Sequence, residues 1–153
     1  LLWLTQQSTQ GILEIGYPDP RKRNLVQQIT RSSSKMKPQI RHGKIEMTIE
    51  VREEGNIGEQ DGSLKLTKGM IPTLEKSEAA EIKKEIEACL QKCQQEFHSD
   101  IFGFGTEFER HFPQKWKRLQ KQWDTEYTQL KVKVTVQAKI RGVGIINDPI
   151  NLQ

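Results

Sequence analysis

Two runs of alternating apolar and polar residues most constrain what this chain can fold into. The apolar members of the first run are Ile45, Met47, Ile49 and Val51, and those of the second, which extends from Leu130 to Arg141, are Val132, Val134, Val136, Ala138 and Ile140. A period of two places these side chains on one face of a strand. The first run is followed by a glycine-rich segment, Gly55 to Gly62, which predicts a loop. The sequence therefore predicts two long strands that are each covered on one face only.

Two weaker strands are predicted ahead of the first run. Residues 10–17 predict a short strand, and residues 24–37 predict an edge strand in which Leu25 and Ile29 face inward. His42-Gly43 is the predicted hairpin turn between this edge strand and the first long strand.

A long amphipathic helix is predicted from residue 77 to residue 100. Ser77 is its expected N-cap, and Glu78 and Glu81 suit the positive N-terminal end of the helix dipole. Its apolar stripe consists of Ile82, Ile86, Cys89 or Leu90, Cys93 and Phe97. Gly103 is expected to end the helix in a left-handed conformation.

The segment after the long helix combines aromatic residues and glycines with further helix signals. Thr106-Glu107-Phe108-Glu109 is a capping box, which predicts a short helix that ends at Phe112. Pro113 suits the first position of another helix. In that helix Trp116 and Trp123 lie on one face, and we expect both indoles to be buried against the sheet.

The order of these elements, strands then helices then a strand, indicates an α+β fold. We expect an antiparallel or mixed β-sheet with the long amphipathic helix and the shorter helices packed on one face. A chain of 153 residues is about one domain in length. The expected organisation is a single domain over 1–153, with strands and loops in 1–76, helices in 77–126 and the closing strand in 130–141.

The composition argues against some functional classes. The chain has 24 basic and 20 acidic residues and a net charge of +4. A dedicated nucleic-acid-binding domain usually concentrates its basic charge more strongly. No stretch of the sequence approaches the roughly 18–20 apolar residues that span a membrane.

The spacing of reactive residues indicates no catalytic or metal site. Cys89 and Cys93 both lie inside the predicted helix, whereas a structural zinc site pairs cysteines across a tight turn. Both are therefore interpreted as core residues. His42, His98 and His111 are widely separated, and no serine lies in a Gly-x-Ser-x-Gly elbow. We expect no enzymatic activity and no cofactor or metal.

Gly103-Phe104-Gly105 is interpreted as a tight turn between two helices. It lacks the third glycine and preceding strand of a dinucleotide-binding motif, and the Lys-Ser/Thr pair of a P-loop. Phe102 and Phe104 are expected to lie beneath the turn. Asp100 is expected to accept hydrogen bonds from backbone N–H groups of the turn.

A basic cluster is interleaved with the two tryptophans and consists of Lys115, Lys117, Arg118 and Lys121. Basic side chains that engage phosphates, with an indole stacked on a base, would suit a nucleic-acid-binding module. At helical spacing, however, the charges lie opposite the indoles, as on an ordinary solvated helix. An anionic membrane surface or an acidic partner protein is the further alternative. The cluster is therefore a possible interaction surface.

Several segments carry a family resemblance. They are Gln94-Gln95-Glu96-Phe97, Ile101-Phe102-Gly103-Phe104-Gly105, the residues Pro113, Trp116 and Trp123, the strand Val132-Lys133-Val134-Thr135-Val136, the turn Glu54-Gly55-Asn56-Ile57-Gly58-Glu59, and the chain end from Ile140 to Pro149. Together they resemble the C-terminal domain of the GerAC-type spore germination proteins, the C subunits of nutrient germinant receptors in endospore-forming bacteria. The match is most specific from about residue 44 to 150. Tyr127 departs from it, standing where the family is expected to have Phe.

The resemblance implies a role for the chain. Family members are lipoproteins anchored at the outer face of the spore inner membrane, where they act with two integral-membrane subunits, A and B, in nutrient sensing. They have no assigned enzymatic activity or cofactor. The implied function is a non-enzymatic receptor domain that acts in receptor assembly and spore germination. The implied structural motif residues are Asp100, Phe102, Gly103, Phe104, Gly105, Pro113, Trp116 and Trp123.

The same resemblance identifies the chain as a soluble C-terminal fragment of a larger lipoprotein, whose lipid anchor lies outside these 153 residues. The alternative function is a small basic nucleic-acid-binding module. The resemblance itself implies no nucleic-acid partner.

Overall fold

The computed structural model describes residues 11–15, 25–59 and 67–145. Parts of four predicted features lie outside these ranges. They are the ends of the 10–17 strand, residue 24 of the 24–37 strand, residues 60–62 of the glycine-rich segment, and Ile146 to Pro149 of the family motif.

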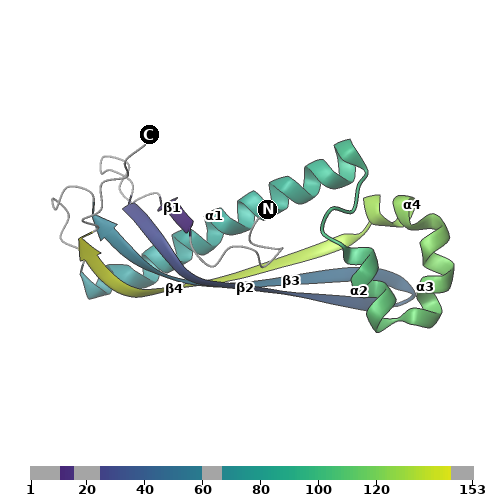
Figure 1. The fold of residues 1–153 in the computed structure, drawn as a ribbon, viewed down its shortest axis with the longest axis horizontal. Coiled ribbons are helices and arrows are strands. Elements are labelled where there is room, and N and C mark those ends of the chain that lie inside the picture. Colours follow the sequence, from purple (N-terminus) through teal and green to yellow (C-terminus); the bar gives the residue numbers. More distant parts are fainter. Residues whose placement is uncertain (1–10, 16–24, 60–66, 146–153) are drawn as a thin grey trace.

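The strands form a four-stranded mixed sheet in the order β1-β2-β3-β4 (Figure 1). They are β1 (Gly11–Ile15), β2 (Leu25–Arg41), β3 (Lys44–Glu59) and β4 (Lys131–Ile145). β1–β2 and β2–β3 are antiparallel pairs, whereas β3 and β4 are parallel. A parallel pair needs a long crossover connection, and here that connection carries every helix that the structure describes.

The helices of the crossover cover one face of the sheet, which confirms the predicted α+β fold. They are α1 (Ile71–Lys92), α2 (Phe104–His111), α3 (Pro113–Leu119) and α4 (Trp123–Thr128), with the short 3₁₀ turns η1 (Lys68–Met70) and η3 (Gln120–Gln122) and the π-helical turn η2 (Cys93–Phe97). Figure 1 shows α1 lying along the sheet, while α2, α3 and α4 gather at the end where β2 turns into β3. Among the described residues, no helix has both the length and the apolar character to cross a membrane.

The β2–β3 hairpin follows the sequence closely. His42 (φ 50°) and Gly43 (φ 77°) are both left-handed, as a two-residue hairpin turn requires. Leu25 and Ile29 are buried as predicted. The predicted edge position is wrong for the start of β2, because Leu25 to Ile29 lie between β1 and β3.

The prediction of a loop at Gly55 is wrong, since β3 continues through Gly55 and Gly58 to Glu59. Glycine at position 55 allows the backbone of β3 to pack closely against Gln27 and Gln28 of β2. A Cβ at this position would lie 2.7 Å from the backbone oxygen of Gln28 and would also contact the Gln27 side chain. The strand therefore uses glycine where β2 comes closest, which a single sequence does not distinguish from a loop signal.

The long helix is displaced from its predicted bounds. It begins at Ile71, where Pro72 occupies the first turn, and Ser77 lies inside it. It does not reach Gly103, because His98 (φ 47°) already adopts the left-handed conformation that ends η2. Gly103 (φ 75°) instead precedes α2.

The apolar stripe of α1 is confirmed except at its end. Ile82, Ile86, Leu90 and Cys93 are buried, whereas Phe97 is 66% exposed. A π turn holds more residues than an α turn, so η2 rotates Phe97 away from the sheet. The expected position of Glu78 at the N-terminal end of the helix is also wrong, since Glu78 lies well inside α1, where it is 0% exposed on the buried side.

One large hydrophobic core fills the space between β3, β4 and the helices. Its fully buried members include Ile49, Ile82, Phe104, Phe108 and Tyr127. A second and smaller cluster joins Leu25, Ile57 and Leu74 near the start of α1. The two halves of α1 therefore rest on clusters of different size.

Candidate functional site

Asp100 organises the turn that leads into α2. One carboxylate oxygen, Oδ1, accepts a hydrogen bond from the Phe104 N–H (3.0 Å), and Oδ2 accepts one from the Gly105 N–H (2.7 Å). Oδ2 also accepts a hydrogen bond from the indole Nε1–H of Trp123 (3.0 Å). A carboxylate at this end of a helix satisfies free N–H groups and faces the positive end of the dipole. The predicted role of Asp100 is thus confirmed, and its bond to Trp123 was not predicted.

The predicted capping box is wrong, because α2 already begins at Phe104 and the segment from Thr106 to Glu109 lies inside it. Asp100 supplies the capping oxygens instead. Both Phe102 and Phe104 are buried beneath the turn, as expected.

Gly105 lets two indoles approach the backbone of α2. A Cβ on Gly105 would lie 2.8 Å from Cη2 of Trp116 and 3.0 Å from Nε1 of Trp123, closer than carbon side chains normally pack. The two indole rings meet edge to face, with centroids 5.1 Å apart and an interplanar angle of 68°. Gly105 and the two tryptophans therefore form one packed unit.

Around this unit lies an aromatic cluster, which consists of Phe102, Phe104, Phe108, Phe112, Trp116, Trp123 and Tyr127. Phe104, Phe108 and Tyr127 are fully buried in it, whereas Trp116 and Trp123 are only half-buried. The single helix predicted for the two tryptophans is interrupted at η3, so that Trp116 lies in α3 and Trp123 begins α4. The two indoles therefore cover the outer side of the large hydrophobic core.

Gln94, in the π turn, ties the cluster to the start of β4. Its side-chain Nε2 donates hydrogen bonds to the carbonyl oxygens of Tyr127 and Leu130, both at 2.9 Å. The Tyr127 carbonyl lies in the last turn of α4 and that of Leu130 just beyond it, where backbone acceptors lack partners within the helix. Gln94 belongs to the sequence motif, but its role was not predicted because the π turn that aims it was not.

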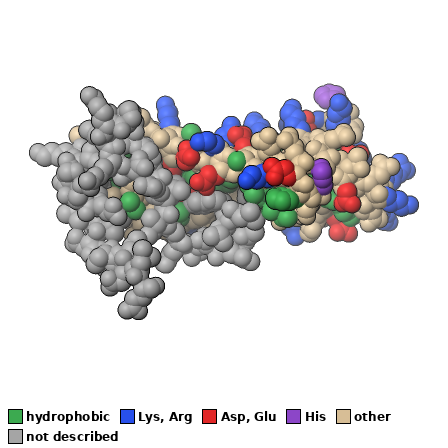
Figure 2. Space-filling model, turned by 90° about the horizontal axis from the view of Figure 1, so that it is seen from above, with side chains coloured by type: hydrophobic (Ala, Val, Ile, Leu, Met, Phe, Trp, Pro, Cys, Tyr) green, Lys and Arg blue, Asp and Glu red, His purple; other side chains and the backbone are tan. Residues whose placement is uncertain are grey.

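The four residues of the basic cluster, Lys115, Lys117, Arg118 and Lys121, are all exposed. They lie on α3 and η3, in a stretch from 113 to 122 that contains no acidic residue. Figure 2 shows basic side chains projecting at this end of the molecule. No ion pair between described residues involves any of the four. The four basic residues predicted as an interaction surface thus lie close together, next to the packed rings of the aromatic cluster.

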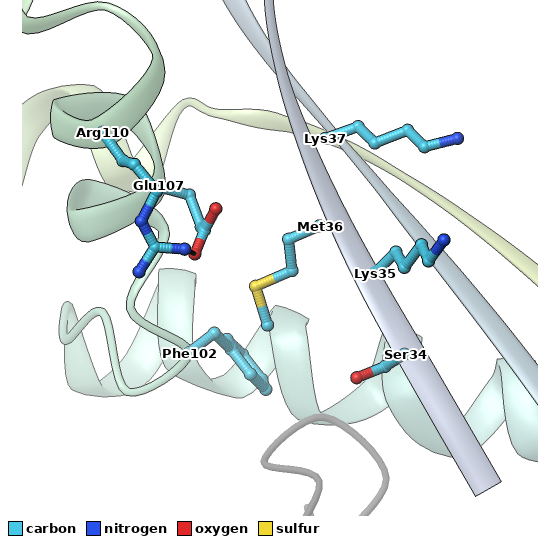
Figure 3. A pocket seen from close by; sticks show the side chains of 7 residues that line it. All are labelled: Ser34, Lys35, Met36, Lys37, Phe102, Glu107 and Arg110. Carbon is cyan, nitrogen blue, oxygen red and sulfur yellow. Dashed lines mark hydrogen bonds and ion pairs between the residues drawn. The ribbon is translucent and has the colours of Figure 1, made fainter.

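A groove of about 430 Å³ lies between β2 and α2 (Figure 3). Met36 and Phe102 face one another across it, and Arg110 is held by Glu107 at 3.0 Å. Lys37 is likewise paired, with Glu50 at 2.6 Å. The groove therefore has an apolar floor, and ion pairs already occupy the charged groups of Arg110 and Lys37.

The cysteines lie where a core interpretation puts them. Cys93 is buried in the large core and Cys89 is half-buried beside it, and both are free thiols. Within the described ranges, no three side chains of the types that bind metals come together.

Sequence reasoning missed Gln27, Glu53 and Glu78, the most deeply buried polar residues that the structure describes, each 1% exposed or less. The sequence does contain a burial signal for the two glutamates. Glu53 continues the alternation of Met47, Ile49 and Val51, so it belongs to the inward row of β3, and Glu78 lies four residues before Ile82 on the apolar stripe.

Comparison with known proteins yields concordant matches. A family model described as "Spore germination B3/ GerAC like, C-terminal" matches residues 1–144. Spore germination protein KC of Bacillus subtilis (strain 168) is 30% identical over 128 residues, which cover 82% of this chain and 31% of that protein. Spore germination protein YndF of the same organism is 22% identical over 147 residues, covering 95% of this chain and 36% of that protein.

A solved structure shares the fold. The crystal structure of the GerBC protein superposes with a TM-score of 0.80 at 20% sequence identity, over 92% of this chain and 43% of that one. The chain spans about a third of the length of these two curated relatives.

Proposed function

This chain belongs to the GerAC-like C-terminal family of spore germination proteins, and from that membership we propose that it is a domain of a germinant-receptor C subunit. The domain is non-enzymatic and acts in receptor assembly during nutrient-triggered germination. It forms one domain over 1–153 in a longer, lipid-anchored protein at the outer face of the spore inner membrane. The partners proposed for it are the integral-membrane A and B subunits.

The observation that carries this proposal is the basic cluster on α3 and η3. The four exposed cations lie in a stretch, 113–122, that contains no acidic residue, next to the aromatic cluster in which Asp100 and Gly105 position the indoles. Such a surface is attracted to acidic partner loops or to anionic headgroups, by about 1 kcal/mol per basic residue near a charged membrane. Because the aromatic side chains that support this surface are already packed, they need no further ordering when it binds.

The alternative of a nucleic-acid-binding module receives no support from the relatives, since the matched curated proteins are named for spore germination.

A pull-down from solubilised spore inner membranes tests the proposed assembly role. The bait is this chain, compared with a variant that reverses all four charges: Lys115→Glu, Lys117→Glu, Arg118→Glu and Lys121→Glu. The matched control reverses four exposed lysines of α1: Lys76→Glu, Lys83→Glu, Lys84→Glu and Lys92→Glu.

The original chain and the α1 control should retain the A and B subunits, and the α3 variant should lose most of them. Equal recovery with all three baits would show that the basic cluster is not the contact surface. Failure of the original chain to retain either subunit would contradict the assembly role itself.

A further inference from the structure

Gln27, Glu53 and Glu78 meet where the first half of α1 crosses the sheet, since Glu78 acts on the pKa of Glu53, and Gln27 and Glu53 act on that of Glu78. Gln27 comes from β2, Glu53 from β3 and Glu78 from α1, and their exposed fractions are 0%, 1% and 0%. The small cluster of Leu25, Ile57 and Leu74 lies on the same elements. Gly55 leaves the space that the Gln27 side chain occupies. The site is thus built from three elements and closed from solvent.

The polar atoms of this site have no conventional partners among the described residues. Both amide atoms of Gln27 and all four carboxylate oxygens of Glu53 and Glu78 are buried without a hydrogen bond. An ionised carboxylate can only accept, so two facing carboxylates cannot bond to each other. When one of them is protonated, its O–H can donate to the other. A single proton would therefore join the two carboxyl groups by a hydrogen bond.

The surroundings favour the protonated form. Burial raises the pKa of Glu53 to about 8, and the neighbouring Glu78 carboxyl adds to this shift. Burial likewise raises the pKa of Glu78 to about 7, although the neighbouring side chains of Gln27 and Glu53 lower it in part; Glu75 adds to the rise. Glu85 of α1 also acts on Glu53.

The cations of the adjacent strand β4 are already engaged elsewhere. Lys139 pairs with Glu75 at 3.2 Å, and Arg141 pairs with Glu54 at 2.7 Å. Among the described residues, none of the groups that shift the pKa of Glu53 or Glu78 is a cation. Two carboxylates in such a place resist ionising together.

We propose that Glu53 and Glu78 form a proton-binding site that fastens the first half of α1 to the sheet. With a proton shared between the two carboxyl groups, α1 is seated on β2 and β3. Loss of that proton leaves two buried anions facing each other and loosens residues 71–81. Residues 82–92 stay in place, because Ile82, Ile86 and Leu90 rest on the large core. This inference does not depend on the receptor role proposed above.

The sign of the pH effect follows from linkage. Both carboxyl groups have a higher pKa in the folded chain than the ordinary value of 4.5 expected when it is unfolded. The folded state therefore binds more protons, and stability falls as the pH rises through about 7 to 8. Most acidic residues that are paired in folded proteins give the opposite slope.

Thermal unfolding followed by circular dichroism tests the proposal. The melting temperature of the original chain should fall by at least about 5 °C between about pH 5.5 and pH 8.5. The double variant Glu53→Gln, Glu78→Gln should lose most of this pH dependence, since amides do not titrate. The matched control is Glu87→Gln, an exposed carboxyl on the same helix, which should keep the full slope. A slope that survives in the double variant would overturn the proposal.

Direct titration covers the case in which the double variant does not fold. Carbon-13 NMR of glutamate-labelled original chain should show carboxyl groups that titrate above about pH 6, against an ordinary value near 4.3. Assignment uses the single variants Glu53→Gln and Glu78→Gln. Titration of both groups below that range would refute proton sharing.

Two further measurements distinguish a proton-binding site at Glu53 and Glu78 from other roles of these residues. Amide exchange, corrected for its intrinsic pH dependence, should show that residues 71–81 lose protection at high pH before residues 82–92 do. Calcium or magnesium, compared with EDTA at high pH, should leave the melting temperature unchanged. Stabilisation by a divalent cation that disappears in the double variant would mean a metal site and would overturn the proton site.

Discussion

At the scale of single residues, Asp100 and Gly105 have the clearest tasks. Asp100 satisfies two backbone N–H groups and one indole N–H with a single carboxylate. Gly105 is the position at which both indoles touch the backbone. Each residue can be tested by a small substitution, because each acts through a contact that the substitution removes or blocks.

Replacing Asp100 with Ala should lower the free energy of unfolding by about 2–4 kcal/mol, since a lost helix cap and an unsatisfied indole N–H both contribute. Chemical denaturation followed by circular dichroism measures the loss. Asp124→Ala is the control, because Asp124 is exposed in the first turn of α4 and its loss should cost below about 1 kcal/mol. Equal effects of the two substitutions would contradict the capping role of Asp100.

Replacing Gly105 with Ala should destabilise the chain by about 1–3 kcal/mol, although alanine favours a helix, because the added methyl group collides with Trp116 and Trp123. Tryptophan fluorescence should shift to longer wavelength as the indoles move outward. Gly69→Ala, where nothing lies within 4 Å of the added atom, should leave stability and fluorescence nearly unchanged. An unshifted spectrum for Gly105→Ala would show that the indoles do not depend on this glycine.

At the scale of elements, the π turn after α1 decides which apolar residues are buried. It ends the stripe at Cys93, turns Phe97 outward, and aims Gln94 at the end of α4. A helical period of 3.6 carried through this turn would have buried Phe97. One turn of altered geometry thus separates the stripe of α1 from the exposed segment behind it.

Truncating two residues of the predicted stripe tests this boundary. Ile86→Ala should cost about 2–5 kcal/mol, as expected for a buried isoleucine. Phe97→Ala should change the free energy of unfolding by less than about 0.5 kcal/mol, because its ring is exposed. Chemical denaturation of both variants gives the comparison. A large loss for Phe97→Ala would mean that the stripe continues through the turn.

The elements were predictable from sequence where a pattern repeats and less so where one residue interrupts it. The alternation in β3 and β4, the turn at His42-Gly43 and the helix start at Pro113 are all present as predicted. The start of α1 was missed because Ser77 is a good cap in isolation, whereas Leu74 is held in the helix by contacts with Leu25 and Ile57. Contacts of this kind depend on residues distant in sequence.

The candidate site was predictable in its membership but not in its geometry. The basic residues and the tryptophans were identified from spacing alone. The hydrogen bond between Asp100 and Trp123 joins residues on different elements, so no local pattern reveals it. The buried glutamates were missed for a different reason: acidic residues are normally read as exposed, even when they fall on an apolar row.

At the scale of the whole molecule, the two ends of the sheet are held in different ways. The end near the β2–β3 turn is packed with aromatic rings under a basic surface, and the other end rests on a small apolar cluster and a buried acid pair. Both tryptophans of the aromatic cluster belong to the first end. Their fluorescence therefore reports on that end, and loosening of residues 71–81 should leave it unchanged until the chain unfolds globally.

The parallel pairing of β3 with β4 also has a consequence for how the chain reaches this structure. Glu46 pairs with Lys131, and every helix of the crossover lies between them in sequence. The β2–β3 hairpin can form early because its two strands are near neighbours in sequence. β4 can pair with β3 only after the crossover has been synthesised and has folded onto the sheet. During synthesis on the ribosome, β3 therefore lacks its neighbour β4 until almost the whole domain has been made. A chain that is truncated before β4 therefore cannot complete the sheet.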